Sequence, residues 1–362
     1  MRPSETFIDP ESKNKAAANY LRCAYFAGPD WIPCNVGLMP ATWREHREGL
    51  EEVVLDFPRL FPGYSRGDRD FDAPGDRRYR RGRFTDNWGC TWQNVAPGLA
   101  AAPVDWPIKT WEDFDHYQPP DPVTEGEGRN GPPDWQALRR RCERAKEQGR
   151  LAWGGMPHGS MYMRLYYLRG FENLMADLAT DEPRLRELIE MVLDYNLRMV
   201  EKNIECGAEI IGFGDDLGMQ TSLPMSPAKW RRYLLPCYER LFGLCRRAGV
   251  EVRLHSDGHM LEIIPDLVRA GVRIINPQIR ANGLEGLERT ARGEVCIHLD
   301  LDRQLFPFAG PDRIREHILE AVDRLGRPDG GLMLHAECEP DVPLQNIRAI
   351  CETLDRIGGP LQ

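Results

Sequence analysis

The stretch "LHSDGHM" at residues 254–260 places two imidazoles and a carboxylate close together, on His255, Asp257 and His259. It follows the apolar alternation of "VEVRL", which is typical of a strand. Side chains of these types can hold a divalent metal ion or transfer protons, and both chemistries need them in a shared pocket. The third possibility is that they are only the polar end of a strand.

Similar polar residues follow the neighbouring apolar runs of the chain. In order, these residues are Asp215 and Asp216 after "EIIGFG", Asn276 and Gln278 after "VRII", His298, Asp300 and Asp302 after "EVCI", and His335, Glu337 and Cys338 after "GLML". Active sites at the C-terminal mouth of an α/β barrel are built from such strand ends. We therefore expect these side chains to converge on one pocket.

The elements that must position these residues are short apolar runs that alternate with helical segments. From residue 136 the runs are "LAWGGM", "EIIGFG", "VEVRLH", "VRIINP", "EVCIHL" and "GLMLHA", and their alternation with helices is typical of parallel βα units. Together with "WIPCNVGL" they give seven strands, and one more in the N-terminal third would complete a (β/α)8 TIM barrel. We predict one barrel domain over residues 1–362. Residues 1–135 form its irregular, loop-rich N-terminal extension, including the first strand, and residues 136–362 form regular βα units.

A metal site at this mouth would use His255 and Asp257, with a third ligand from Glu337 or Cys338 after the last strand. A thiolate from Cys338 would favour zinc, whereas the carboxylate of Glu337 would make a harder site. The alternative is acid/base chemistry without a metal, carried by His255 and three acids: Asp215, Asp216 and Asp302. In the plainer interpretation, the adjacent pair of acids only caps the next segment.

A substrate in this pocket would contact further side chains. Four candidates follow the strand ends: His158, Asn276, Gln278 and His259. Two more, Trp88 and Trp92, lie in the irregular segment from Asp86 to Gly98, "DNWGCTWQNVAPG", where large aromatic side chains need a concave surface to cover. We predict that this segment folds over the barrel mouth and lines the pocket with both indoles. The alternative is a plug at the bottom of the barrel.

Composition limits the classes of protein to consider. A hydrophobic content of 41% with 28% charged residues indicates a folded globular protein. The net charge of −9 argues against nucleic-acid binding, although the arginine-rich stretch "DRRYRRGR", with arginines from Arg77 to Arg83, can clamp a polyanion. The N-terminus lacks the apolar core of a signal peptide, no run is long enough to span a membrane, and the ten cysteines form no C-x-x-C pair. We expect a cytoplasmic protein with reduced thiols.

Six stretches of the chain resemble, in order, the blocks of the uroporphyrinogen decarboxylase superfamily. They are "NVGLMPATWREHREGLEEVVLDFPRLFPG", "DNWGCTWQNVAPG", "YLRGFENLMADLATDEPRLRELI", "GFGDDLGMQTSLPMSPAKWRRYLLPCYERL", "LHSDGHMLEIIPDLVRAGVRIINPQ" and "LHAECEPDVPLQNIRAI". The resemblance implies a (β/α)8 barrel with one of two activities. These are metal-free decarboxylation of the acetate side chains of uroporphyrinogen, and zinc-dependent methyl transfer between a corrinoid protein and a small acceptor such as a thiol or a folate.

Two motifs separate the branches of this superfamily. True decarboxylases carry an arginine-bearing "RQAGRY"-like motif soon after the first strand, where this chain reads "CNVGLMPATWREHR". The methyltransferase branch binds zinc through a His-x-Cys pair and a later cysteine. Here "HSDG" keeps His255 with Asp257 at the cysteine position, and "HAEC" supplies Glu337 and Cys338 near the final ligand. A carboxylate in place of a thiolate would make the ion a stronger Lewis acid, suited to a water or an ether oxygen.

The resemblance therefore implies a corrinoid-dependent methyltransferase with zinc as its metal. It would move a methyl group between a small organic donor or acceptor (a methoxy compound, methylamine, folate or thiol) and a corrinoid protein that carries methylcobalamin. That protein would be separate, because this chain has no cobalamin-binding Asp-x-His-x-x-Gly signature. The alternative is a uroporphyrinogen decarboxylase-like carboxy-lyase acting on a porphyrinogen or another polycarboxylate. A binding protein without catalysis is the third interpretation.

Overall fold

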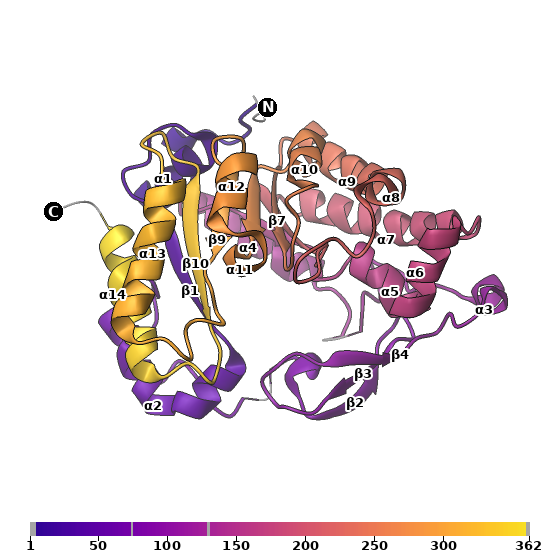
Figure 1. The fold of residues 1–362 in the computed structure, drawn as a ribbon, viewed down its shortest axis with the longest axis horizontal. Coiled ribbons are helices and arrows are strands. Elements are labelled where there is room, and N and C mark those ends of the chain that lie inside the picture. Colours follow the sequence, from indigo (N-terminus) through magenta and orange to yellow (C-terminus); the bar gives the residue numbers. More distant parts are fainter. Residues whose placement is uncertain (1–4, 74, 129–130, 360–362) are drawn as a thin grey trace.

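The core of the computed structural model is a curled parallel sheet with helices on its outside (Figure 1). The structure describes residues 5–73, 75–128 and 131–359. Neighbouring strands follow the order β1-β10-β9-β8-β7-β6-β5. Their bounds are β1 (Cys34–Leu38), β5 (Trp153–Gly155), β6 (Ile210–Gly214), β7 (Glu251–Ser256), β8 (Ile274–Pro277), β9 (Cys296–Asp300) and β10 (Leu332–Cys338). This is the TIM-barrel-like α/β fold that the alternation of apolar runs and helices predicts.

Helices connect and cover these strands. They are α1 (Lys15–Tyr25), α2 (Pro40–Asp56), α3 (Trp111–His116), α4 (Trp135–Glu147), α5 (Tyr162–Arg169), α6 (Phe171–Thr180), α7 (Leu185–Glu205), α8 (Pro227–Tyr233), α9 (Leu235–Arg247), α10 (Ile264–Ala270), α11 (Ile279–Asn282), α12 (Leu284–Thr290), α13 (Pro311–Leu325) and α14 (Leu344–Ile357). No helix in the described part of the chain is both long and apolar enough to cross a membrane.

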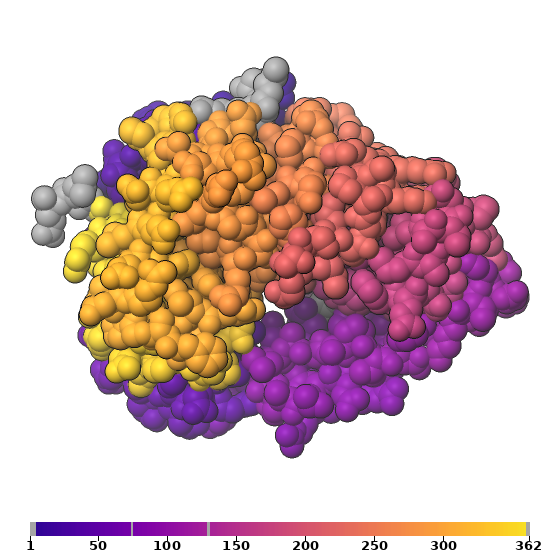
Figure 2. All heavy atoms as spheres, in the orientation of Figure 1, coloured from indigo at the N-terminus to yellow at the C-terminus, as the bar shows by residue number. Residues whose placement is uncertain are grey.

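The barrel sheet has seven strands within the described residues, and the eighth strand expected in the N-terminal third is not found there. That third instead contains a separate antiparallel sheet of β2 (Gly82–Thr85), β3 (Thr91–Asn94) and β4 (Ala102–Asp105). Short strands with a turn between them pair with each other more readily than with a distant parallel edge. The sheet β2–β4 lies across the open side of the barrel (Figure 1), and Figure 2 shows the hollow between it and the C-terminal half.

Local sequence chemistry explains several element boundaries. The side chain of Asn14 accepts a hydrogen bond from the backbone N–H of Ala17 at the start of α1, and Ser226 does the same for Lys229 at the start of α8. After α9, Gly249 adopts a left-handed φ of +71°, which ends the helix without a Cβ clash. All ten cysteines are free thiols, and nine of them are buried.

The pleat of the strands decides which side chains reach the inside of the barrel. On β7, Arg253 and His255 are partly exposed while their neighbours Val252 and Leu254 are buried among the helices. Strand β10 shows the same alternation, with His335 and Glu337 partly exposed. Successive side chains of a strand point to opposite faces. The inner face therefore carries the polar residues, and the outer face packs on the helices.

Candidate active site at the mouth of the barrel

Two adjoining cavities open at the C-terminal ends of the strands. The inner one has a volume of about 680 Å³ and its polar lining comprises His158, Arg253, His255, Asp257, Asn276, Asp300, Arg303, His335, Glu337 and Glu339. The outer one, of about 730 Å³, is lined by Asp216, Gln278 and Asp302 among others. Both cavities share Asp257, Arg303 and Glu339. The strand ends therefore converge as predicted, on a polar and largely acidic pocket.

His255 is held in one orientation by its neighbours. Asn276 Oδ1 accepts a hydrogen bond from Arg253 Nη2 at 2.7 Å, and its Nδ2 donates to the carbonyl of His298. Since this fixes which atom of the amide is oxygen, the Nδ1 of His255, 3.0 Å from Asn276 Oδ1, must carry a hydrogen and donate it. The second ring nitrogen, Nε2, faces the cavity and lies 3.2 Å from Asp257 Oδ1.

The protonation of this pair follows from its surroundings. Burial lowers the pKa of His255, but the neighbouring carboxylates, Asp257 first among them, outweigh burial and leave that pKa raised. Burial raises the pKa of Asp257, yet the contact with His255 and the charge of Arg303 outweigh it and leave that pKa lowered. His255 can therefore accept and hold a proton at Nε2, or offer a lone pair there when it is neutral.

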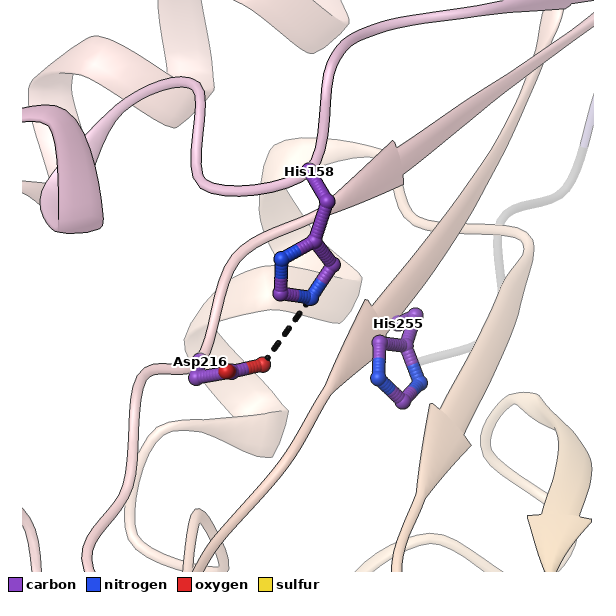
Figure 3. A group of neighbouring side chains, drawn as sticks. All are labelled: His158, Asp216 and His255. Carbon is purple, nitrogen blue, oxygen red and sulfur yellow. Dashed lines mark ion pairs between the residues drawn. The ribbon is translucent and has the colours of Figure 1, made fainter. Parts of the chain in front are cut away.

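The side chains of His158, Asp216 and His255 lie close together, and the ring of His158 points toward Asp216 (Figure 3). His158 Nε2 lies 3.1 Å from Asp216 Oδ1, and the rings of His158 and His255 are 5.7 Å apart between centroids. The ring of His158 packs over Gly214, where a Cβ would lie 2.7 Å from the ring carbon Cδ2. Because Gly214, the last residue of β6, has no side chain, there is room for the imidazole of His158. His158, predicted as a substrate contact, and Asp216, predicted as a proton donor or acceptor, are brought together here.

A close backbone contact fixes the loops that carry Asp216 and Asp257. Gly218, after β6, and Gly258, after β7, touch so closely that a Cβ on Gly258 would lie 2.2 Å from the carbonyl oxygen of Gly218. The N–H of Gly218 also donates to the carbonyl of Asp257. In turn the N–H of Asp257 donates to Asp216 Oδ1 at 3.2 Å. This contact holds the carboxylate of Asp216 beside the inner cavity.

Arg303 is the centre of the acidic part of the pocket. Its guanidinium donates to Asp257 Oδ1 at 2.9 Å, to Asp300 Oδ2 at 2.9 Å and to Glu337 Oε1 at 2.7 Å. The predicted metal ligands Asp257 and Glu337 are therefore both bound to a cation of the protein itself. A metal ion coordinated by His255, Asp257 and Glu337 would have to displace this guanidinium. The observed contacts therefore do not fit a metal bound by the predicted ligands.

Cys338 does not reach the pocket, and its prediction as a metal ligand is wrong. It follows Glu337 directly on β10, so its side chain points to the opposite face, where it is 0% exposed in the hydrophobic core. Burial raises the pKa of its thiol well above the usual value. A neutral thiol packed against helices offers no ligand to a metal in the barrel.

Asp300 is the carboxyl of the inner cavity whose titration is most altered. Burial raises its pKa to about 7, although the positive charges of Arg303 and His255 oppose the rise. Its Oδ1 is buried and has no hydrogen-bond partner. A carboxyl group with a pKa near neutral can both donate and accept a proton at physiological pH. Asp300 is therefore a candidate general acid or base.

This burial predicts a pH-dependent effect of the substitution Asp300→Asn on stability. A carboxyl whose pKa is raised on folding contributes stability that is present below its unfolded pKa of about 4 and is lost as pH rises through about 7. Asparagine has no such loss. The variant should therefore gain stability relative to wild type as the pH rises from 5 to 8, by at most about 4 kcal/mol in the free energy of unfolding. Its melting temperature should exceed that of wild type by more at pH 8 than at pH 5. Thermal unfolding at both pH values checks this, and an equal difference at both would contradict it.

Two further histidines, His335 in the lining of the inner cavity and the buried His298, form a neutral polar chain. His298 Nε2 lies 2.7 Å from Asn35 Oδ1, and Asn35 Nδ2 lies 2.8 Å from His335 Nδ1. Burial, aided by the charge of Arg253, lowers the pKa of His298 well below its usual value and that of His335 to about 3. Both rings are therefore neutral, and Asn35 on β1 connects them across the sheet.

Asp215 was predicted to act in acid/base chemistry, and the structure corrects this. Its carboxylate accepts hydrogen bonds from the backbone N–H groups of Met161, Tyr162 and Met163 and from the hydroxyl of Tyr238. It is fully buried, and burial raises its pKa while these donors oppose the rise. Asp215 therefore caps a helix, but this helix is α5, which precedes it in the chain, and not the following segment of the plainer interpretation. Its neighbour Asp216 points the other way and lines the outer cavity.

The remaining predicted polar residues are divided between the two cavities, except for His259. Asp302 lines the outer cavity, where Arg280 donates to it at 2.8 Å, and Gln278 Oε1 accepts from the N–H of Gly258. His259 contacts the carbonyl of Ala281 and the carboxylate of Glu262 and lines neither cavity. Of the predicted substrate contacts, Asn276 and His158 lie in the inner cavity.

Trp88 and Trp92 do not line the pocket, which corrects the prediction for both indoles. They are 1% and 3% exposed, and they pack on Tyr195 of α7 and Tyr167 of α5. Large aromatic rings gain more from full burial against helices than from a half-open cavity. The chain just beyond the predicted segment does reach the mouth, because Leu99 and Ala100 line the inner cavity.

Sequence reasoning missed Arg303 and Arg253 as site residues. Arg253 was detectable, because it lies two positions before His255 and two positions along a strand return to the same face. Arg303 lies beyond the end of β9, in a loop whose path the sequence does not fix. Its long side chain turns back over the strand ends to meet three acids.

Comparison with known proteins places the chain among its relatives. It matches the family model described as uroporphyrinogen decarboxylase (URO-D) over residues 94–357. It is 26% identical over 156 residues to the uroporphyrinogen decarboxylase of Nocardia farcinica, covering 42% of each chain. It is 25% identical over 197 residues to that of Thermus thermophilus, covering 52% of this chain and 54% of the relative. The chain thus spans about half the length of the curated relatives it matches.

Among solved structures, a methyltransferase from Methanosarcina mazei is similar over 94% of this chain and 98% of its own. The TM-score is 0.63 at 16% sequence identity, which shows a shared fold. The family model extends from the end of β3 to the end of α14 and so includes six of the seven barrel strands with their polar ends. Because this match covers well over half of the sequence, the chain belongs to the uroporphyrinogen decarboxylase (URO-D) family.

Proposed function

We propose that this protein is a corrinoid-dependent methyltransferase that moves a methyl group between a small organic compound and a separate corrinoid protein. The observation that carries the proposal is the charge of the inner cavity. Its lining has two arginines, Arg253 and Arg303, and four acids. Arg303 is already bound to three carboxylates, and Arg253 is bound to Asn276 and His298. Such a pocket repels a polycarboxylate and favours a neutral or cationic substrate.

The shared fold of the Methanosarcina mazei methyltransferase supports this proposal at the level of architecture. When its partner protein is bound, the corrinoid would supply the methyl-carrying chemistry. The residues of this chain would bind and orient the small substrate at the inner cavity, with His255 Nε2 facing it. We expect Asp300, whose pKa is raised to about 7, to supply or remove the proton that balances methyl transfer to or from an oxygen or nitrogen atom.

A spectroscopic assay tests the proposal directly. The protein is incubated with free cob(I)alamin and a panel of methoxylated aromatic compounds and methylamines, and formation of methylcobalamin is followed by absorbance. The reverse reaction starts from methylcobalamin with a thiol or a folate. We expect turnover with at least one compound. Release of CO2 from uroporphyrinogen, without turnover in either corrinoid assay, would overturn the proposal.

The alternative, a carboxy-lyase acting on a porphyrinogen or another polycarboxylate, is favoured by the names of the curated relatives. It would need cations that replace the missing arginine motif. The candidates in the stretch "DRRYRRGR" lie just before the small antiparallel sheet and, for Arg83, on its strand β2. There Arg80 donates to the carbonyl of Gly75 and Arg81 to that of Val95, and neither arginine lines the inner or the outer cavity.

This placement predicts that Arg80→Ala and Arg81→Ala change methyl-transfer activity by less than about threefold when made singly and by less than about sixfold when combined. Both side chains are exposed and lie outside the two cavities, and such substitutions alter free energies by about 0.5 kcal/mol or less each. The measurement is kcat/KM in the corrinoid assay. Complete loss of activity on a polycarboxylate in the double variant would instead establish the carboxy-lyase.

A further inference from the structure

We infer that His158, Asp216 and His255 form a binding site for one divalent transition-metal ion, with zinc as the expected ion. This set shares His255 with the one that the sequence pattern indicates but has His158 and Asp216 in place of Asp257 and Glu337 or Cys338, and its members come from three different strand ends. One ligand atom from each lies within 4.8 Å of the other two (Figure 3). Across the described ranges 5–73, 75–128 and 131–359, this is the only such group of histidine, cysteine or acidic side chains. The inference concerns metal binding itself and does not depend on methyl transfer.

The orientation of His255 is that of a metal ligand. A metal-binding imidazole usually donates its other ring N–H to an oxygen of the protein, which fixes the tautomer. Here Nδ1 donates to Asn276 Oδ1, itself held by Arg253 and by the carbonyl of His298. In the neutral ring this leaves the Nε2 lone pair directed into the cavity.

The backbone around His158 fixes the position of its side chain. Its loop is tied to β6 by two hydrogen bonds, from the N–H of Met156 to the carbonyl of Gly212 and from the N–H of Gly159 to the carbonyl of Gly214. The absence of a Cβ at Gly214 admits the ring, as described above. A histidine that only contacts solvent does not need so restricted a conformation. The restriction directs Nε2 of His158 toward Asp216.

Asp216 supplies the oxygen ligand. Its Oδ1 faces His158 Nε2 and also accepts from the N–H of Asp257, so its position is set by the contact between Gly218 and Gly258. Unlike Asp257 and Glu337, it is not bound to Arg303 in the structure. The nearby acids Asp257, Asp300, Glu337 and Glu339 give the cavity the negative potential that attracts a cation.

Two imidazoles and one carboxylate are a typical ligand set of catalytic zinc, with a fourth position left for water or substrate. Tetrahedral zinc with ligand distances of about 2.0–2.1 Å separates its ligand atoms by roughly 3.4 Å. His158 Nε2 and Asp216 Oδ1 already lie 3.1 Å apart. To reach the spacing of tetrahedral ligands, either His255 must move toward this pair or the pair must move toward His255. All three side chains are partly exposed, His158 and His255 to the inner cavity and Asp216 to the adjoining outer one, and this space provides the fourth position.

Metal analysis of purified protein tests the inference. After removal of bound metal with a chelator and dialysis against zinc, we expect about one zinc per chain by mass spectrometry. His158→Ala, Asp216→Ala and His255→Ala should each weaken zinc affinity by more than about a hundredfold, because even second-sphere changes cost ten- to a hundredfold. Gly214→Val keeps all three ligands but displaces His158, so it should weaken binding as well.

Three control variants separate this site from the set that the sequence pattern indicates. Cys338→Ser and His259→Ala, which removes an imidazole from the loop after β7, should keep zinc affinity within about threefold of wild type. Glu337→Gln removes one of the surrounding charges but no ligand, so it should weaken zinc binding by less than about tenfold. The cobalt(II) form should lack the near-ultraviolet charge-transfer band of a thiolate ligand. Loss of zinc in the Glu337 or Cys338 variant, a thiolate band, or protein that binds no metal would each overturn the inference.

These measurements read metal content and not turnover, so they are separable from the proposed function. A protein that binds zinc through the three residues but fails every corrinoid assay would keep the site and remove the methyltransferase. A protein that transfers methyl groups without binding metal would do the opposite.

Discussion

Replacing His255 with alanine is expected to reduce turnover by about a hundredfold to ten-thousandfold while leaving the fold intact. His255 is the residue on which the local network converges. Asn276 orients its ring, Asp257 lies against its Nε2, and His158 packs beside it. Whether Nε2 binds a metal or moves a proton, alanine removes the only atom that can do so from this position. Loss of a positioned ligand or proton carrier typically costs this much in rate.

The measurement is kcat/KM in the corrinoid assay, with circular dichroism and thermal unfolding as tests of the fold. Added imidazole should restore part of the activity, because the substitution leaves a space of that shape beside Asn276. A His255→Ala variant that turns over within about threefold of wild type would remove His255 from the active site. Unfolding of the variant would be read from the melting curve and not mistaken for a catalytic effect.

Strand periodicity predicts much of this site. The apolar runs and their polar ends indicate a parallel barrel with a pocket at the C-terminal mouth, and the structure has both. The same periodicity also predicts that two adjacent residues of a strand point to opposite faces. Glu337 and Cys338 are adjacent on one strand, as are Asp215 and Asp216 at the end of another, so only one of each pair can face the pocket.

Other features of the site depend on tertiary contacts that no local pattern records. Arg303 reaches the acids from a loop, and nothing in "LDRQLF" indicates that its side chain returns over the strand ends. His158 follows a strand of three residues, and its position depends on a glycine far along the chain, Gly214. Long side chains and loop approaches of this kind are decided by packing between distant segments, which spacing in sequence does not encode.

The indoles of Trp88 and Trp92 illustrate a third reason. Their segment looks like a lid because it is irregular and aromatic, but its aromatic rings cover a buried charge instead. The guanidinium of Arg164 on α5 lies 4.9 Å from the ring centroid of Trp88 and 5.4 Å from that of Tyr167. It forms ion pairs with Asp86, at 3.3 Å, and with Glu127. The segment thus joins the N-terminal third to the barrel through a polar centre.

This centre predicts that Arg164→Leu lowers the free energy of unfolding by about 3–5 kcal/mol. The side chain of Arg164 is 0% exposed, as is that of Asp86, and leucine would remove the guanidinium from the buried carboxylate of Asp86 and one ion pair from Glu127. Removing one partner of a buried ion pair costs far more than the pair contributes, because the remaining charge stays out of water. Chemical unfolding followed by tryptophan fluorescence measures the change.

The triple variant Arg164→Leu, Asp86→Asn and Glu127→Gln separates charge from packing. If the loss arises from uncompensated carboxylates, neutralising them should recover a large part of it, because amides of the same shape cost less to bury than charges. If it arises from the lost packing of the guanidinium on Trp88, the triple variant should be as unstable as the single one. The indole N–H of Trp92 donates to Asp86 Oδ2 and the backbone N–H of Cys90 donates to Asp86 Oδ1, at 2.9 Å each, so the single amide oxygen of asparagine can keep only one of these bonds. We therefore expect a clear but incomplete recovery of the lost free energy, and a loss below about 1 kcal/mol in the single variant would refute the role of Arg164 altogether.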